Sequence, residues 1–211
     1  MHLSAYNNAQ RFYDVYNKSF ADGFKVVEVG SQNVNGSMRP IFERDCDYTG
    51  LDWVDGKGVD IVLTEAYKFP IPDECADIIT CSSAFEHSEM FWVTFLEVMR
   101  ILKPQGLFYM NAPSNGGFHQ FPVDCWRFFP DSGKAFVTWG KHNGYKPALL
   151  ESFISHREGG KVWNDFTMVM VKDESYVSRY PTRILDTFEN FYNGHKHGET
   201  EILNRAWLHE L

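Results

Sequence analysis

Two carboxylates in the N-terminal part of the chain have the setting of a nucleotide site. Glu28 lies in a β-branched run, Lys25-Val-Val-Glu-Val-Gly, which predicts a short buried strand that ends at Gly30. A buried Glu is costly unless it is hydrogen-bonded, so we expect Glu28 to hold the following loop or to touch a ligand. Asp52 ends the next strand-like run, Tyr48-Thr-Gly-Leu-Asp-Trp. A carboxylate at the tip of a second strand is the usual partner of two ribose hydroxyls.

The glycines between these carboxylates indicate which nucleotide fits. Gly30 and Gly36 let the backbone pass close to a bound molecule because they carry no Cβ. A dinucleotide fingerprint requires another glycine two residues after the first, to admit a pyrophosphate, and this chain has Gln32 there. A cofactor without a pyrophosphate fits better, which points to S-adenosylmethionine.

From Val26 to about Leu107 the chain resembles class I methyltransferases, and among them the type 11 methyltransferase domains. The resemblance is carried by segments that occur in the same order: Glu28-Val-Gly-Ser, Asp52, Phe69-Pro-Ile-Pro-Asp-Glu with Asp77, Phe85-Glu86-His87, and Leu102-Lys-Pro-Gln-Gly-Leu. It implies a Rossmann-like fold that uses S-adenosylmethionine and releases S-adenosylhomocysteine.

The resemblance also implies which residues contact the cofactor. These expected contacts are Glu28, Gly30, Ser31, Gly36, Asp52, Trp53, Glu65, Ala66, Ser82 and Ser83. Glu65-Ala66 stands where the family has an Asp-Ala pair beside the adenine ring, so Glu65 departs from the family pattern. Trp53 lies along the adenine face or is a plain core aromatic, and both interpretations stay open.

A second set of reactive side chains lies in residues 111–130, directly after the predicted fifth strand. Open α/β sheets bind ligands at this carboxyl edge. Methyl transfer from a sulfonium is an in-line displacement, so the protein mainly has to position the acceptor. If the acceptor is a hydroxyl, a general base accelerates the reaction. His119 is the candidate base, Asp124 orients it or binds the substrate, and Arg127 is suited to pair with a phosphate or carboxylate.

The pattern that starts at His119, His-x-x-Pro-x-Asp-x-Trp-Arg-Phe, resembles a subgroup of these methyltransferases associated with glycan and surface-polysaccharide synthesis. This resemblance implies a sugar-like acceptor. The expected substrate contacts are His87, Asn111, Trp126 and Arg127. In the family the Glu86-His87 pair mostly shapes the loop after the fourth strand, so a structural role for His87 stays open.

A plainer interpretation of the 111–130 loop is also open. Asp124 and Arg127 then form an internal ion pair that pins the loop, Trp126 and Phe128 belong to the core, and His119 is structural. Elsewhere, His195-Lys-His197 and the later His209 lie in polar surroundings, and we predict solvated histidines and no metal site there or elsewhere.

Apolar periodicity predicts the elements that must position these residues. The predicted helices span residues 4–20, 37–44, 88–102 with Ser88 as N-cap, and 131–143 with Asp131 as N-cap. The predicted strands after the first two span 59–63, 77–81, 107–110, 148–154 and 166–171. Residues 53–60 are too rich in glycine for a full crossover helix. The last two strands have a short connection, so they form an antiparallel hairpin.

These elements predict an α/β class I methyltransferase fold with a seven-stranded, mostly parallel sheet. Residues 1–172 form the S-adenosylmethionine-dependent domain, with the N-terminal helix covering the sheet and cofactor. Residues 173–211 form a helical extension of two amphipathic helices, whose apolar residues are Ile184, Leu185, Phe188, Phe191, Tyr192, Ile202, Leu203, Ala206 and Trp207. Those faces pack on the core or form a homodimer contact.

Composition limits the partners. The 211 residues carry a net charge of −8, which argues against nucleic acid or an anionic membrane as partner. The four cysteines show no C-x-x-C spacing, so we expect buried, reduced thiols and a cytoplasmic protein. No apolar run approaches the length of a membrane span, and the N-terminus lacks the features of a secretion signal.

The sequence therefore predicts an S-adenosylmethionine-dependent methyltransferase that O-methylates a small polar acceptor, such as a sugar, a nucleotide-sugar or a glycan. One alternative is a partner subunit that binds the cofactor without catalysis. Another is a nucleotide-dependent oxidoreductase, which Gln32 and the closing hairpin disfavour.

Overall fold

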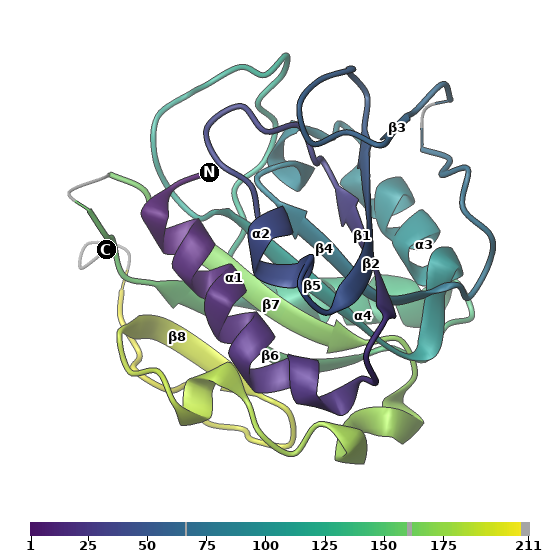
Figure 1. Ribbon diagram of the computed structural model, residues 1–211. Coiled ribbons are helices and arrows are strands. Elements are labelled where there is room, and N and C mark those ends of the chain that lie inside the picture. The colour runs from purple at the N-terminus through teal and green to yellow at the C-terminus, as the bar shows by residue number, and fades with distance from the viewer. Residues whose placement is uncertain (66, 160–161, 208–211) are drawn as a thin grey trace.

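An eight-stranded sheet runs through the protein (Figure 1). The computed structural model describes residues 1–65, 67–159 and 162–207. The strands are β1 (Phe24–Val29), β2 (Cys46–Asp52), β3 (Ile61–Val62), β4 (Ala76–Ser82), β5 (Leu102–Pro113), β6 (Ala148–Ser155), β7 (Asp165–Val171) and β8 (Phe191–Lys196). Their order in the sheet is β3-β2-β1-β4-β5-β7-β6-β8.

The strand directions divide the sheet into two parts. The first five strands run parallel to one another, whereas β5–β7, β7–β6 and β6–β8 are antiparallel pairs. The β6–β7 hairpin is therefore present where a dehydrogenase would need another crossover helix. The chain passes from β1 to β2 and β3 on one side and then crosses to β4 on the other side of β1. A parallel sheet opens a ligand crevice at such a switch point.

Helices cover both faces of the sheet (Figure 1). They are α1 (Leu3–Tyr16), α2 (Arg39–Phe42), α3 (Phe91–Ile101) and α4 (Pro130–His142). Because side chains alternate along a strand, Val26 and Tyr109 pack with α1 and α2, whereas Val27 and Phe108 pack with α3 and α4. No helix in the described part of the chain has both the length and the apolar character needed to cross a membrane.

Two helices have N-caps other than the predicted ones. The N-cap of α3 is Met90, and the hydroxyl of Ser88, the predicted cap, instead hydrogen-bonds Thr94 at 3.0 Å. The N-cap of α4 is Phe129, so Asp131 lies inside the first turn. Pro130 opens α4 because proline has the helical φ and its missing N–H is not needed at that position.

The C-terminal extension differs from the two predicted helices. Its described residues form 3₁₀ turns at Glu174–Arg179 and Ile184–Asp186, followed by β8, so the prediction of seven strands and a helical extension was wrong. The edge strand β6 offers unpaired backbone groups, and β8 pairs with them. The apolar residues Ile184, Leu185, Phe188 and Phe191 pack in the core, which leaves them unavailable for the dimer contact considered above.

The four cysteines are unpaired, as predicted, but they are not all buried. Cys81 is buried in β4 and Cys125 is exposed in the 111–130 loop.

A buried carboxylate ties the extension to the N-terminal helix. Glu151 in β6 is fully buried and accepts hydrogen bonds from the Tyr16 hydroxyl at 2.5 Å and from the backbone N–H groups of Ile184 and Leu185 at 2.9 and 3.0 Å. Burial raises the pKa of Glu151, and these donors oppose that rise. Three elements that are distant in the sequence thus meet at one side chain.

We expect Tyr16→Phe to lower the free energy of unfolding by about 1–3 kcal/mol, because it removes one donor from a buried acceptor. Urea denaturation measures the change. Tyr176→Phe, at a residue that is 39% exposed, is the matched control and should leave the midpoint unchanged. Equal midpoints for Tyr16→Phe and wild type would show that this hydroxyl does not stabilise the fold.

Candidate active site

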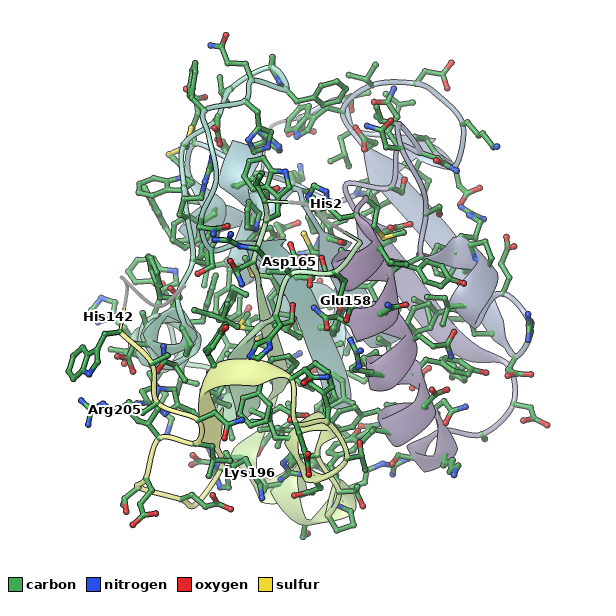
Figure 2. All side chains as sticks on the ribbon, turned by 90° about the vertical axis from the view of Figure 1, so that its left-hand side faces the viewer. His2, His142, Glu158, Asp165, Lys196 and Arg205 are labelled. Atoms are coloured by element: carbon green, nitrogen blue, oxygen red, sulfur yellow. The ribbon has the colours of Figure 1, made fainter. Side chains whose placement is uncertain are left out.

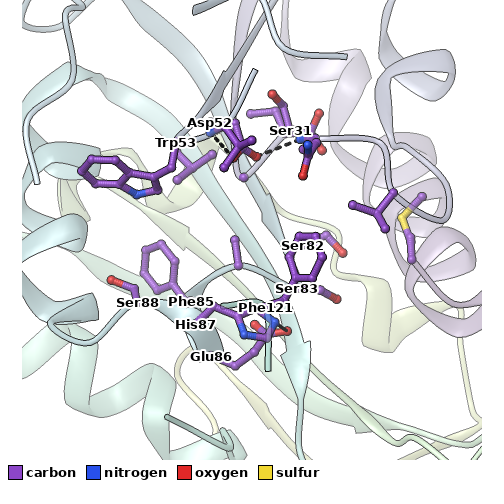
Figure 3. A pocket seen from close by; sticks show the side chains of 18 of the residues that line it. Ser31, Asp52, Trp53, Ser82, Ser83, Phe85, Glu86, His87, Ser88 and Phe121 are labelled. Carbon is purple, nitrogen blue, oxygen red and sulfur yellow. Dashed lines mark hydrogen bonds and ion pairs between the residues drawn. The ribbon is translucent and has the colours of Figure 1, made fainter. Parts of the chain in front are cut away.

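A cleft of about 670 Å³ opens at the carboxyl ends of the parallel strands (Figure 3). Its walls come from the N-terminus, the turns after β1, β2 and β4, the 111–130 loop, and Trp163 between β6 and β7. Figure 3 shows Asp52 and Trp53 on one side and Glu86 and His87 across from them.

The turn after β1 is held by backbone geometry. Gly30 has φ +78°, a conformation that favours glycine, and a Cβ at this position would overlap the Cβ of Ala84. The N–H groups of Gly30 and Ser31 both donate to the carbonyl of Leu51, at 2.9 and 3.0 Å. The ends of β1 and β2 and the loop after β4 are therefore brought together at the floor of the cleft.

Asp52 organises the same turn. Its carboxylate accepts hydrogen bonds from the backbone N–H of Gln32 at 2.9 Å and of Val54 at 3.2 Å. The Asp52 carboxylate thus holds the backbone of Gln32, the residue that stands where a dinucleotide fingerprint has glycine. A carboxylate has more acceptor sites than these two bonds use, so Asp52 can also receive hydroxyl groups from a ligand in the cleft.

Glu28 also lines the cleft and is 4% exposed. It accepts a hydrogen bond from the Tyr48 hydroxyl at 2.7 Å. Burial raises the pKa of Glu28 to about 7, although the Tyr48 bond and the Arg39 charge oppose this rise. The fold therefore keeps, at the floor of the cleft, a carboxyl group whose charge is costly.

The walls formed at the ends of β1 and β4 carry polar atoms without partners among the described residues. Ser31, Ser82 and Ser83 line the cleft, and their hydroxyls are buried with no hydrogen bond to any described residue. Buried polar groups in folded proteins almost always have partners, so orphaned hydroxyls in a cleft are expected to bind a ligand or water.

The 111–130 loop contains the ion pair that the plainer interpretation predicted. Both Asp124 oxygens face Arg127, at 2.6 and 2.9 Å, and the guanidinium holds the pKa of Asp124 well below its usual range. Asp124 Oδ2 also accepts the His119 backbone N–H at 2.7 Å and lies 3.3 Å from His119 Nδ1. Asp124 thus both pins the loop and positions His119, which lines the cleft.

The predicted site residues separate into two groups. Most of them line the cleft: Glu28, Gly30, Ser31, Gly36, Asp52, Trp53, Ser82, Ser83, His87 and His119. Asn111, Asp124, Trp126 and Arg127 are not among the lining residues, and neither is Glu65, which is exposed and pairs with Lys68 at 3.4 Å. Ala66 lies outside the described residues.

Packing explains why two expected substrate contacts lie elsewhere. Asn111 is fully buried, and its side-chain oxygen accepts from Asn8 at 3.1 Å and from Thr167 at 3.2 Å. The Trp126 indole donates to the carbonyl of Ser88 at 2.9 Å and packs edge-to-face on Phe91. Both side chains therefore join secondary-structure elements rather than face the cleft.

Several lining residues were not expected from the sequence. His2 and Trp163 stack with ring centroids 5.6 Å apart, and Trp163 meets His119 edge-on at 5.0 Å. The Ser4 hydroxyl donates to the buried carboxylate of Asp165, which ties the start of α1 to β7 near this point (Figure 2). These contacts join distant segments, so no local pattern signals them. Glu86 did carry a signal, because it stands within the Phe85-Glu86-His87 motif.

Comparison with known proteins agrees with this geometry. Residues 32–110 match the family of methyltransferase domains. A 1,6-didemethyltoxoflavin-N1-methyltransferase from Burkholderia thailandensis, solved with S-adenosylhomocysteine, is similar with TM-score 0.62 and 12% identity over 81% of this chain and 79% of that chain. No sequence among curated proteins matches the chain.

Two further solved structures share the fold. A SAM-dependent methyltransferase from Aquifex aeolicus has TM-score 0.51 and 13% identity over 75% of this chain and 88% of that chain. The YcgJ protein from Bacillus subtilis has TM-score 0.55 and 13% identity over 79% of this chain and 99% of that chain. The chain therefore has the fold of S-adenosylmethionine-dependent methyltransferases, and the family match supports S-adenosylmethionine as its cofactor.

We expect Asp52→Ala to weaken binding of S-adenosylmethionine and S-adenosylhomocysteine by about 1.5–3 kcal/mol, the usual loss for hydrogen bonds to a charged group. Calorimetric titration measures it. The exposed neighbour Asp55→Ala is the matched control and should bind as wild type does. Unchanged affinity in Asp52→Ala would remove this residue from the cofactor site.

Glu28 predicts a pH dependence of stability. Its folded-state pKa of about 7 lies above the ordinary 4.5, so the folded protein binds this proton more tightly than the unfolded chain. Stability from this group therefore falls as pH rises from about 4.5 to 7. We therefore expect the stability of Glu28→Gln relative to wild type, measured by denaturant unfolding, to increase as the pH rises from 5 to 8. Exposed Glu89→Gln is the control; if both variants show the same pH dependence, the charge of Glu28 is not costly.

Proposed function

We propose that this protein is an S-adenosylmethionine-dependent methyltransferase that methylates a hydroxyl of a small polar acceptor, such as a sugar, a nucleotide-sugar or a glycan. One observation supports it best. The Gly30 turn, which the Asp52 carboxylate holds, lies on one side of the cleft, and His119, which Asp124 positions, lies on the other side of the same cleft.

The cofactor would lie on the side of the cleft formed by β1 and β2. Asp52 would accept the ribose hydroxyls, and Gly30 would let the cofactor approach the backbone. Trp53 is 52% exposed at the edge of the cleft, where its ring is available to an adenine. The orphaned hydroxyls of Ser82 and Ser83 would lie near the cofactor's opposite end.

The acceptor would enter between the 111–130 loop and Trp163. Aromatic rings of His2, Phe121 and Trp163 line this part of the cleft, and such faces suit the apolar faces of a sugar ring. The resemblance of the His119 to Phe128 pattern to a glycan-associated subgroup supports the same acceptor class.

His119 would activate the acceptor hydroxyl. Its Nδ1 faces Asp124 Oδ2 at 3.3 Å and the carbonyl of Gly117 at 3.4 Å, which favours a proton on Nδ1 and a lone pair on Nε2. Arg127 also lies 3.4 Å from Nδ1, but the same nitrogen of Arg127 already donates to Gly117 and Asp124 at 2.9 Å. As the hydroxyl oxygen attacks the methyl carbon, its proton passes to His119 and the C–S electron pair stays on sulfur.

We expect His119→Ala to lower kcat for methyl transfer by about 10²–10⁴, the usual contribution of a positioned acid or base, while S-adenosylhomocysteine binds as in wild type. Mass spectrometry of sugar and sugar-nucleotide acceptors incubated with the cofactor detects the product. His142→Ala changes an exposed histidine at the end of α4 and is the matched control. Failure of wild type to bind either S-adenosyl compound would overturn the proposed function, and full activity in His119→Ala would overturn the role of His119.

A further inference from the structure

Three potential metal ligands converge at the acceptor side of the cleft. Glu86 and His87 lie in the 3₁₀ turn Phe85–His87 that follows β4, and His119 comes from the loop after β5. One ligand atom from each of the three lies within 4.8 Å of the other two. All three side chains line the cleft.

The Glu86 carboxylate lacks the partners that a buried acid normally has. It is fully buried, and neither of its oxygens has a hydrogen bond to any residue in the described part of the chain. The guanidinium of Arg127 is already bonded to Asp124. A buried carboxylate in this state needs a cation or a proton to offset its charge.

Both histidines are oriented as metal ligands are. His87 Nδ1 is bonded to the carbonyl of Val123, which can only accept, so Nδ1 carries the proton and the lone pair is on Nε2. That Nε2 lies 3.7 Å from Glu86 Oε1. His119 Nδ1 faces Asp124 and Gly117, which leaves its own Nε2 with the lone pair. Metal-bound histidines usually donate their other N–H to a carbonyl or a carboxylate in this way.

We propose that Glu86, His87 and His119 bind one divalent transition-metal ion, whose open positions take the hydroxyl oxygens of the acceptor. This proposal deepens the proposed function and rests on it for the reaction, but not for metal binding itself. Two imidazoles and one carboxylate suit ions such as Mn²⁺, Fe²⁺, Co²⁺ or Zn²⁺ better than Mg²⁺ or Ca²⁺. Three protein ligands leave room for substrate, as in catalytic metal sites.

The ion favours an acceptor with two adjacent hydroxyls, because such a pair can occupy two open positions at once. Coordination lowers the pKa of a bound hydroxyl, so it can lose its proton to solvent near neutral pH. The oxygen then forms a bond to the methyl carbon as the C–S bond breaks, and the electron pair of that bond remains on sulfur. With the ion bound, loss of the proton to solvent replaces the proton transfer to His119 described under the proposed function, and His119 acts as a ligand of the ion instead.

Metal–ligand distances are about 2.0–2.2 Å in such sites, so the three side chains must move closer together than they are here. His119 allows this movement, because its side chain is 38% exposed and comes from a loop. Glu86 and His87 are neighbours in one turn and would form the fixed part of the site.

His195 and His197, the histidine pair singled out in the sequence, do not share these features. His195 Nε2 lies 3.4 Å from the ammonium of Lys134, and the Nδ1 of His197 bonds the carbonyl of Leu149 at 3.1 Å. A neighbouring ammonium opposes a metal cation. Among the described residues, only Glu86, His87 and His119 form a group of three or more metal-ligating side chains. His209, considered with this pair, lies outside the described residues.

Cobalt titration of the purified full-length protein tests the proposal. Co²⁺ bound to imidazole and carboxylate ligands has visible d–d absorption, and calorimetry gives its affinity. We expect one Co²⁺ per chain in wild type, and affinity reduced by about tenfold or more in Glu86→Gln, His87→Ala and His119→Ala, since loss even of residues that only support a ligand costs 10–100-fold. His142→Ala is the matched histidine control, because His142 is not among the residues that line the cleft and lies apart from His2 (Figure 2).

S-adenosylhomocysteine binding, measured on the same samples, separates the two proposals. If wild type does not bind Co²⁺, or if all three variants bind it with wild-type affinity, the metal site is overturned. Intact S-adenosylhomocysteine binding in the same samples would keep the proposed function. Absence of S-adenosylhomocysteine binding would overturn the proposed function even if cobalt binds. Methyl transfer that survives complete chelation would overturn the activating role of the ion, and loss on chelation with recovery on adding Co²⁺ or Mn²⁺ would support it.

Discussion

The cleft depends on the close approach of two backbone turns. Gly30, with its positive φ, packs directly against Ala84, so the turn after β1 meets the loop after β4 with no space for another side chain. The Leu51 carbonyl and the Asp52 carboxylate then bind the N–H groups of residues 30–32. Because the chain goes from β1 to β2 and β3 on one side and then crosses to β4 on the other side of β1, this contact lies where the sheet opens its crevice. The loops that carry Glu86 and His119 start from that fixed floor.

Two fully buried glutamates show how a structural acid differs from one held for a ligand. Glu151 receives a hydroxyl and two backbone N–H groups, and in this way it joins α1, β6 and the C-terminal extension. Glu86 has no such donors among the described residues, and its unpaired oxygens lie at the cleft. An unpaired buried charge costs several kcal/mol, so Glu86 needs either a proton or a cation to offset its charge. The metal ion proposed above would be that cation.

The acceptor side is assembled from distant parts of the chain. Ser4 and Asp165 hold the start of α1 against β7, which brings His2 to Trp163. Trp163 packs against Gly116, where a Cβ would overlap its ring, and reaches His119. Asp124 connects this group to the loop through Arg127. The aromatic character of this side and the position of His119 thus result from several tertiary contacts acting together.

The sequence by itself determined the features that depend on neighbouring residues. The β-branched run before Gly30, the carboxylate of Asp52 and the short connection of the β6–β7 hairpin each act locally, so their patterns predicted the parallel core, the closing hairpin and the floor of the cleft. The abbreviated crossover over residues 53–60 followed in the same way from its glycines.

Tertiary structure decided the remaining features, because these features depend on which partner each side chain contacts. Residues 184–192 have helical spacing, yet the open edge of β6 and the acceptor Glu151 draw them into turns and β8. Asn111 and Trp126 have types suited to binding, but hydrogen bonds to other parts of the fold engage their side chains. Glu86 and His119 stand far apart in the sequence, and only the adjacency of β4 and β5 brings them to one point. Residue types and local spacing specify the strands and turns, whereas the packing of distant segments determines which polar groups remain unpaired and free to bind a ligand.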